Sequence, residues 1–323
     1  MTGNTSTQAH CANWTVAKPT EPDLPLSLVI GFYAAGGLVC IATLVGNIFV
    51  IISFAKFPVL RTTSNYFLLS LAIADGTSGP ATMLFLLVNL ATGFHINNKY
   101  THMLCVLAVN LNAVAYSGSL FSVMGVACER YVKVIYSLRY ERLMPPQRAK
   151  HILAVLWIFN FVMCCPVFIW NRPMLGRRCN KRVFHALHMY AIILPPIAAA
   201  ILVTTVLYAR LFCVAWRHRH AIRALELSSA DHHGKVAVAK REAKLTKTAG
   251  MIIGLLYASW LPYLVGGVLL EGREDLLSIS ARQTFYLMLT CSSMFNPVVY
   301  QCRIPEFHTA FRKLAASLRG DQI

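Results

Sequence analysis

A few polar side chains interrupt long apolar stretches of the sequence, and these are the first candidates for chemistry. Asp75 is the single acid in the middle of such a stretch. A carboxylate surrounded by apolar residues must be paired, solvated or neutralised. We therefore expect a sodium-binding or protonatable centre built on Asp75, with Ser119, Asn296 and Asn47 nearby. The alternative is a purely structural hydrogen-bond hub.

Two further sets of residues recur at helical spacing. One stripe, at steps of three and four residues, comprises Asn112, Tyr116, Ser119, Val123, Val126 and Arg130, and a second comprises Tyr286, Thr290, Ser293, Pro297 and Tyr300. Each stripe occupies one face of a helix. If both faces point inward, a pocket for a small, partly aromatic ligand forms from Asn112, Tyr116, Trp260, Tyr263 and Tyr286. The alternative is that some of these residues only pack helices together.

The polar residues within the apolar stretches do not form a set that suits catalysis. An enzyme would need paired acids or a Ser/His/Asp set facing one cavity, whereas Asp75 is the lone acid within the apolar stretches. His185 and His188 are metal-ligand candidates or, alternatively, walls of a pocket. We expect no enzyme and no cofactor apart from the sodium ion.

The elements that must position these residues are long and apolar. Hydrophobic residues make up 56% of the 323 residues and charged residues only 13%, with a mean hydropathy of +0.54. Seven charge-poor stretches occur, at 25–54, 62–92, 103–128, 152–171, 183–209, 248–270 and 276–302. Each has about the 20 residues that a helix needs to cross a bilayer, and continuous runs do not match the alternating strands of a barrel. The sequence predicts an all-α membrane protein with a seven-transmembrane helix bundle.

Basic residues in the connections predict the orientation. With the N-terminus outside, the cytoplasmic segments hold 20 Lys and Arg residues and the outer segments nine, as expected when positive charge is retained inside. The net charge of +17 then reflects topology and affinity for anionic lipid headgroups, not nucleic-acid binding. No cleaved signal peptide is visible, and the sequons at Asn4 and Asn13 would be glycosylated outside.

Three regions follow from this reading. Residues 1–24 are expected to form an extracellular glycosylated leader, 25–302 the bundle, and 303–323 a cytoplasmic amphipathic helix and tail. Phe307, Phe311 and Leu314 lie at helical spacing and predict that this short helix rests on the membrane. The charged segment 210–247 is interpreted as a solvated loop.

Short motifs in each stretch resemble those of rhodopsin-like (class A) G-protein-coupled receptors. They are Gly46-Asn47, Leu71-Ala72-Ile73-Ala74-Asp75, Glu129-Arg130-Tyr131, Trp157, Ser259-Trp260-Leu261-Pro262 and Asn296-Pro297-Val298-Val299-Tyr300, with Cys105 at the start of the third stretch. The resemblance covers residues 31–318. Pro195-Pro196 departs from it, because the family's proline in span five stands about one turn later.

The scaffold is most similar to adenosine receptors, through Ala154–Phe159 and Tyr300–Phe307, but it lacks their ligand-binding residues. Gly267 stands where those receptors have an asparagine, and Thr290 where they have a histidine. Monoamine receptors have an aspartate where this chain has Asn112, and retinal pigments have a lysine at the position of Thr290. The ligand class is therefore left unassigned.

The resemblance implies the remaining site residues and partners. It favours a disulfide between Cys105 and Cys179, with Cys11 as a competitor on the same outer face. The implied coupling switch consists of Glu129, Arg130, Tyr131, Leu138, Tyr208, Glu242, Asn296, Pro297 and Tyr300. Outward movement of helix six would activate heterotrimeric G proteins, and arrestin, a receptor kinase and membrane lipid are further partners at the plasma membrane.

Two other classes of function compete with a signalling receptor. A seven-helix receptor that binds its ligand without signalling is the runner-up. A transporter is disfavoured because the two halves of the sequence show no internal repeat.

Overall fold

A computed structural model describes residues 25–92, 96–172, 179–226, 233–270, 273 and 275–319. Side chains are described throughout these ranges except at 215–247, 249 and 318.

The described chain is almost entirely helical. The α-helices are α1 (Leu26–Lys56), α2 (Thr63–Ala91), α3 (Lys99–Ile135), α4 (Tyr140–Leu143), α5 (Pro146–Cys164), α6 (Leu194–Glu226), α7 (His233–Leu269), α8 (Leu276–Arg303) and α9 (Pro305–Leu318). Short 3-10 turns occupy Pro58–Leu60, Ser137–Arg139, Cys165–Phe168 and Lys181–Val183, and a π-helical turn occupies His188–Ile193.

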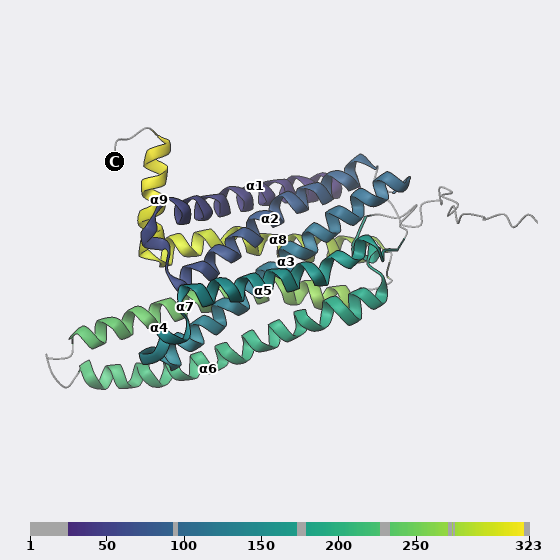
Figure 1. Ribbon diagram of the computed structural model, residues 1–323. Helices are drawn as coiled ribbons and strands as arrows, with labels where there is room; N and C mark the ends of the chain where they lie inside the picture. Colours follow the sequence, from purple (N-terminus) through teal and green to yellow (C-terminus); the bar gives the residue numbers. More distant parts are fainter. Residues whose placement is uncertain are drawn as a thin grey trace, which may run out of the picture.

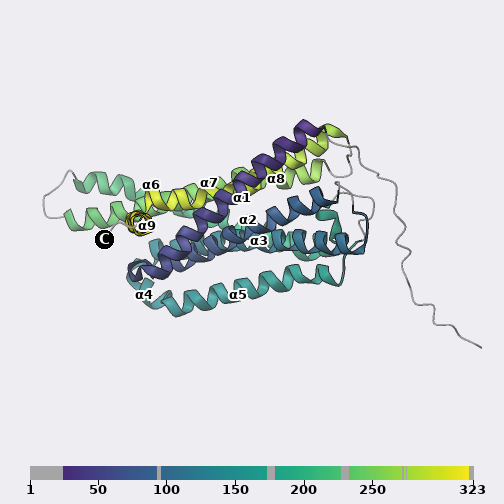
Figure 2. The same cartoon turned by 90° about the horizontal axis from the view of Figure 1, so that it is seen from above.

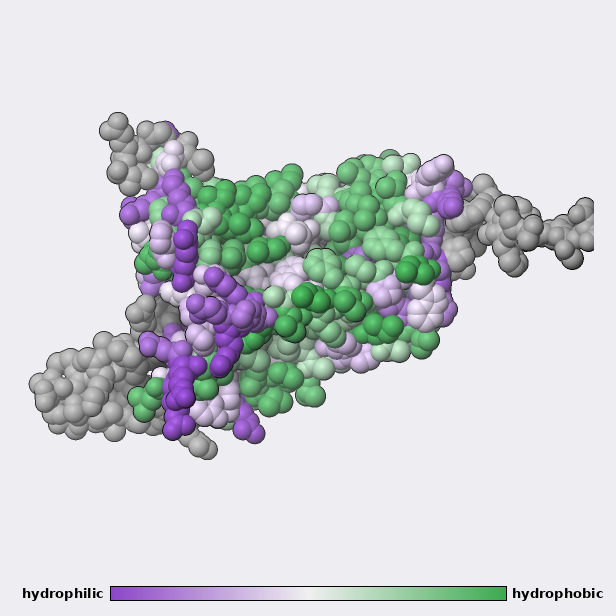
Figure 3. Space-filling model, viewed as in Figure 1, coloured by the Kyte–Doolittle hydropathy of each residue, from purple (hydrophilic) through white to green (hydrophobic). Residues whose placement is uncertain are grey.

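Seven long helices run side by side and make one bundle (Figures 1 and 2). α3 is the central helix and packs against α2, α5, α6 and α7, while α1 packs against α2, α8 and α9. Six of the long helices, α1, α2, α3, α5, α6 and α7, contain segments long and apolar enough to cross a membrane. α8 has the length but carries more polar residues. On the face shown in Figure 3, hydrophobic side chains cover the middle of the bundle and hydrophilic ones gather toward its ends.

α6 and α7 are longer than the sequence predicts. The solvated loop expected over 210–247 is wrong, because α6 continues to Glu226 and α7 begins at His233; residues 227–232 of that segment lie outside the described residues. The cause is composition. Ala, Arg, Lys, Leu and Glu favour helix, even in a segment too charged to enter lipid. Both helices project beyond the end of the bundle at which α9 lies (Figure 1).

The fifth span begins later than predicted and has a distorted first turn. Val183 belongs to a buried 3-10 turn, and the helix starts with the π-turn at His188 before α6 continues from Leu194. Pro195 and Pro196 have no N–H, so they leave the carbonyls one turn earlier without their usual helical donors. A wider turn at this point is a common response to such a break.

Side chains cap the helices at the loops. Thr62 accepts a hydrogen bond from the N–H of Asn65 at the start of α2, and Asn98 and Thr101 form a capping box at the start of α3. Asp275 accepts from the N–H of Ser278 at the start of α8. Hydrogen bonds from Ser278 lower the pKa of the Asp275 carboxyl, so it stays charged at the positive end of the helix dipole.

A glycine allows α1 and α2 to approach closely, which gives a first prediction. A Cβ atom at Gly79 would lie 2.8 Å from the carbonyl oxygen of Cys40, and backbone cannot rotate away as a side chain can. Gly79→Ala should therefore lower the stability of the purified protein by about 1–3 kcal/mol, the usual cost of overpacking.

Gly254→Ala is the matched control, because a Cβ atom there would meet no described atom within 4 Å. It should leave stability unchanged or raise it by up to about 1 kcal/mol through helix propensity. Thermal unfolding of both variants in the same detergent checks the prediction, and equal midpoints would contradict it.

Candidate functional site

The predicted pocket residues lie in the interior of the bundle. Asn112 and Tyr116 are buried on α3 and Trp260 is buried on α7, while Tyr263 and Tyr286 pack partly buried against the same core. The rings of Tyr116 and Tyr286 meet edge to face, with centroids 6.1 Å apart. The two inward stripes therefore converge at this level of the bundle.

A hydrogen-bond network joins α2, α3 and α8 at the same level. The hydroxyl of Thr82 donates to Oδ1 of Asn112 at 2.8 Å and lies 2.9 Å from the hydroxyl of Tyr116. It also lies 3.3 Å from the hydroxyl of Tyr286. Tyr116 in turn contacts the hydroxyl of Thr290 at 2.8 Å. We call these five residues the interior network.

Sequence reasoning missed Thr82, the centre of the interior network. The signal was available, because Thr82 stands seven residues after Asp75 and so occupies the same face of α2. Thr290 was placed on the inward stripe with Tyr286, but it was not among the predicted pocket residues. Its contact with Tyr116 shows that it belongs to the same polar layer as the predicted pocket residues.

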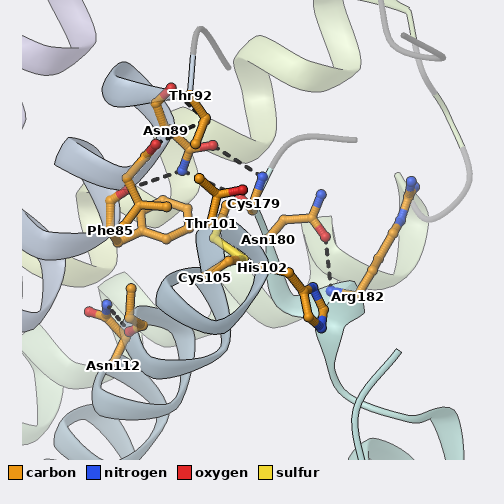
Figure 4. Close-up of a disulfide and its surroundings, with 12 residues drawn as sticks. Phe85, Asn89, Thr92, Thr101, His102, Cys105, Asn112, Cys179, Asn180 and Arg182 are labelled. Carbon is orange, nitrogen blue, oxygen red and sulfur yellow. Dashed lines mark hydrogen bonds between the residues drawn. A yellow bond between two sulfur atoms is a disulfide. The ribbon is translucent and has the colours of Figure 1, made fainter. Parts of the chain in front are cut away.

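A disulfide joins α3 to the loop after α5 at one end of the bundle. Cys105 at the start of α3 and Cys179 in the loop after α5 are bonded, with Cα atoms 5.6 Å apart, as predicted. Asn89 of α2 fixes the loop from the other side, because its Oδ1 accepts from the N–H of Cys179 at 3.1 Å (Figure 4). The competitor Cys11 lies outside the described residues. We refer to this end as the disulfide end.

Asp75 sits deeper in the bundle and is fully buried. Its Oδ1 accepts from the hydroxyl of Ser293 at 2.8 Å, and its Oδ2 accepts from Nδ2 of Asn296 at 2.6 Å. Asn47 donates to the backbone carbonyl of Ser293 at 3.1 Å, and Ser119 faces the same carboxylate. The structure thus gathers the predicted residues around Asp75, in an arrangement that suits either a hydrogen-bond hub or a set of oxygen ligands.

A second polar cluster lies at the opposite end of the bundle, around Glu129. Its Oε2 is 3.4 Å from Nε of Arg130, and both side chains are buried. Its Oε1 accepts from the hydroxyls of Ser64 at 2.6 Å and Tyr140 at 2.5 Å. Burial, together with the Glu129 carboxylate, raises the pKa of Tyr140, so this phenol stays protonated and remains a donor.

Ser64 and Tyr140 were not predicted. Tyr140 follows a 3-10 turn after the end of α3, in the short helix α4. The chain reverses between Glu129 and Tyr140, so helical spacing carries no information about their contact. Only the folded connection between α3 and α5 brings them together.

The other predicted switch residues lie around this end. Nε and Nη1 of Arg130 and the hydroxyls of Tyr208 and Tyr300 are buried without a hydrogen-bond partner among the described residues. Tyr131 is partly buried, and Leu138 is fully exposed on the turn after α3. Pro297 lies inside α8, next to Asn296. Glu242 lies on α7, but its side chain is outside the described residues.

The match to a family model decides the class of protein. Residues 46–300 match the model described as 7 transmembrane receptor (rhodopsin family). The chain belongs to this family.

As a member of the rhodopsin family, the chain has a seven-helix bundle and is a multi-pass membrane receptor of the plasma membrane, not an enzyme. α8 is accordingly the seventh span. Its Tyr286 and Thr290 belong to the interior network, and its Ser293 and Asn296 donate to Asp75.

Several receptors are similar to this chain over most of its length. Adenosine receptor A2b of Gallus gallus is 24% identical over 87% of each chain. 5-Hydroxytryptamine receptor 1 of Aplysia californica is 26% identical over 86% of this chain and 71% of its own length. Alpha-1A adrenergic receptor of Oryzias latipes is 23% identical over 96% of this chain and 71% of its own length. The scaffold is similar to that of adenosine receptors, and such relatives support G-protein-coupled receptor function.

Proposed function

We propose that this receptor binds a small extracellular molecule at the interior network and activates heterotrimeric G proteins by outward movement of α7, its sixth span. The observation that carries the proposal is the interior network itself. It places hydroxyl, amide and aromatic groups from α2, α3 and α8 in one buried layer below the disulfide. Such a mixture of apolar faces and a few directed polar groups is typical of small-molecule sites.

The proposal includes an orientation. The disulfide end faces outward, and residues 1–24, which lie outside the described residues, form a glycosylated leader with acceptors Asn4 and Asn13. At the other end, α9 buries Phe307, Phe311 and Leu314 and exposes Arg312 and Lys313. The apolar face packs on α1 and α8 through Phe49 and Tyr300, and this supports a short amphipathic helix at the inner end whose two basic residues would meet anionic lipid.

The proposed mechanism is a two-state bundle whose equilibrium the ligand biases by binding one state better. Because the interior network is internally bonded, a ligand must exchange some of these hydrogen bonds for its own. Trp260 is buried on α7 and Pro262 lies inside that helix, so a shift here would move the inner half of α7. The buried donors of Arg130, Tyr208 and Tyr300 that have no hydrogen-bond partner among the described residues would then take part in the opened cavity that receives the G protein.

Alanine substitution of the pocket residues tests this function. Asn112→Ala, Tyr116→Ala, Trp260→Ala, Tyr263→Ala and Tyr286→Ala should each weaken the response to an activating compound by about tenfold or more, at equal surface expression. The measurement is nucleotide exchange on purified G proteins. Unchanged responses in all five would refute the pocket. A receptor that binds a labelled ligand but never promotes nucleotide exchange would instead be of the non-signalling type. Arrestin and a receptor kinase are proposed as partners of the signalling type.

A sodium ion is the cofactor that we propose for the site around Asp75. Asp75, Ser119 and Asn296 would bind it through oxygen atoms, and Oδ1 of Asn47 is a buried acceptor without a partner among the described residues. A hard cation prefers such oxygen ligands. The ion would stabilise the resting state, so added sodium should lower agonist affinity.

Asp75→Asn should remove this sodium dependence while leaving hydrogen bonds to Ser293 and Asn296 available. Agonist binding measured in sodium and in potassium chloride at equal ionic strength checks the prediction. Ser78→Ala, which lies on the same helix and donates to the backbone carbonyl of Asp75, is the control that should keep the dependence. Sodium sensitivity that survives in Asp75→Asn would place the centre elsewhere.

A further inference from the structure

A groove lies between α1, α8 and α9, toward the end of the bundle opposite the disulfide. Its volume is about 440 Å³, and every residue that lines it except Gln301 is apolar. The lining includes Ala42 and Phe49 of α1, Val298 and Gln301 of α8, and Phe311 and Ala315 of α9. We call it the α9 groove.

Contacts among the three helices fix the walls of the α9 groove. Gly46 brings α1 close to α8, because a Cβ atom at Gly46 would lie 3.2 Å from Cγ of Pro297. The rings of Phe49 and Phe311 meet edge to face, with centroids 6.3 Å apart, and join α1 to α9. The shape of the groove is therefore built into the packing of the bundle.

The medium beside this groove is lipid, because α1 and α8 are spans of a membrane receptor and Ala42 and Val298 are exposed on their outer sides. An empty groove would leave its lining without contacts on one side, and a single amide offers water too few polar partners. A methylene group is about as large as a water molecule, which takes up about 30 Å³. The volume therefore suits a single acyl chain.

A basic side chain stands where a lipid headgroup would meet α9, which runs crosswise to the long helices (Figures 1 and 2). Arg312 is exposed and lies three residues before Ala315, so the two are neighbours on the surface of α9. Among the described residues, no side chain forms a hydrogen bond or an ion pair with Arg312. Lys313 is also exposed, but it lies two residues from both Phe311 and Ala315 and so occupies another face.

We propose that the α9 groove binds one anionic phospholipid, with an acyl chain between α1 and α8 and the phosphate on Arg312. A guanidinium forms charge-assisted hydrogen bonds with a phosphate. In the proposed orientation this lipid belongs to the inner leaflet, which is rich in anionic lipids. A second copy of the receptor fits less well, because α9 crosses the path of a helix packed along α1. The inference depends neither on the small-molecule site nor on signalling.

Native mass spectrometry of the purified full-length receptor in detergent tests the inference. Phosphatidylserine and phosphatidylcholine with the same two oleoyl chains compete in equal amounts, and glycerophosphoserine supplies the headgroup without chains. One phosphatidylserine should be retained about fivefold more often than phosphatidylcholine, the effect of about one basic residue near a lipid surface. Equal retention of the two lipids, or glycerophosphoserine retained as well as the intact lipid, overturns the inference.

Two adjacent charges on α9 separate a defined site from general attraction to basic residues. Arg312→Gln and Lys313→Gln each remove one positive charge from an exposed position. The preference for phosphatidylserine should fall to about one in Arg312→Gln and persist in Lys313→Gln. An equal fall in both variants would show general electrostatic attraction, and the proposed site would be wrong.

Two adjacent alanines test whether the acyl chain occupies the groove. Ala315 lines the groove and Ala316 does not, although both are partly buried. Ala315→Phe should lower the retention of both lipids about tenfold, because each displaced methylene contributes a factor of about four. Ala316→Phe should retain lipid as wild type does. Unchanged retention in Ala315→Phe contradicts the proposal, and the wild-type lipid competition decides it should this variant not fold.

Two other occupants would each overturn the proposal. If Ala315→Phe dissociates a dimer of the purified receptor and leaves lipid retention unchanged, the groove is an interface between two copies. Cys302 is free and exposed, one residue after Gln301. If the intact mass of wild type includes an acyl chain on Cys302, and phospholipid binds only after hydroxylamine removes it, the occupant is the receptor's own acyl group.

Discussion

Receptor that lacks the disulfide is expected to be nearly absent from the cell surface. Cys105→Ser or Cys179→Ser opens a covalent loop spanning 74 residues. In the chain-entropy account, closing a loop of this length stabilises the folded state by about 4 kcal/mol, a large share of the stability of an ordinary domain. The loop after α5 would also lose its covalent anchor to α3.

Surface immunolabelling of an epitope-tagged receptor measures this effect, and thermal unfolding of the purified protein measures the stability. Cys165→Ser is the matched control, because Cys165 is free and exposed near the end of α5. It should behave as wild type. A Cys105→Ser variant with a normal surface level and melting temperature would contradict the prediction.

Neutralising Glu129 is expected to raise basal signalling by about tenfold or more. In the structure this carboxylate pairs with Arg130 and accepts hydrogen bonds from Ser64 and Tyr140. Glutamine keeps an acceptor but removes the charge, which leaves the buried guanidinium without its counterion. Breaking a buried pair commonly costs about 3 kcal/mol or more. If about 1.4 kcal/mol of this cost destabilises the resting state and not the active state, the ratio of active to resting receptor rises tenfold.

Basal nucleotide exchange without ligand, at equal surface expression, checks this prediction. Glu141→Gln is the control, because Glu141 is exposed on α4 beside Tyr140 and should leave exchange unchanged. Tyr140→Phe removes one hydrogen bond to the charge and should give a smaller rise, about twofold to tenfold. Basal exchange in Glu129→Gln no higher than in wild type would show that this cluster does not hold the receptor off.

A second contact of Arg130 stays a proposal. Glu242 lies 20 residues before Pro262, about 30 Å of helix, which carries it toward the end of the bundle where Arg130 sits. If the Glu242 carboxylate also holds Arg130, the rise in basal exchange in the double variant Glu129→Gln/Glu242→Gln should be smaller than the two single-variant effects combined, because both carboxylates act on one guanidinium. Fully additive increases would separate Glu242 from this cluster.

The sequence by itself determined the class of structure, because lipid leaves the backbone few options. Seven apolar stretches of about 20 residues had to be helices, and polar residues at steps of three and four had to share a face. Those two constraints made it an expectation that Tyr116 meets Tyr286 and that Asp75 meets Asn296, and the packing of the helices brings both pairs together. The Cys105–Cys179 pairing came from the outer-face positions of both residues together with family resemblance, since Cys11 was a competitor on the same face.

Only the tertiary structure decided the contacts that residues make across the loops between helices and at breaks in the helices. Tyr140 reaches Glu129 because the chain reverses after α3, and no periodicity spans such a reversal. The π-turn before Pro195 and the extension of α6 to Glu226 depend on local backbone bonding and propensity, not on hydrophobicity. Cys179 lies beside Asn89 because a disulfide sets the course of one loop. Helical periodicity specifies which face a residue occupies, whereas the packing of separate elements specifies what that face meets.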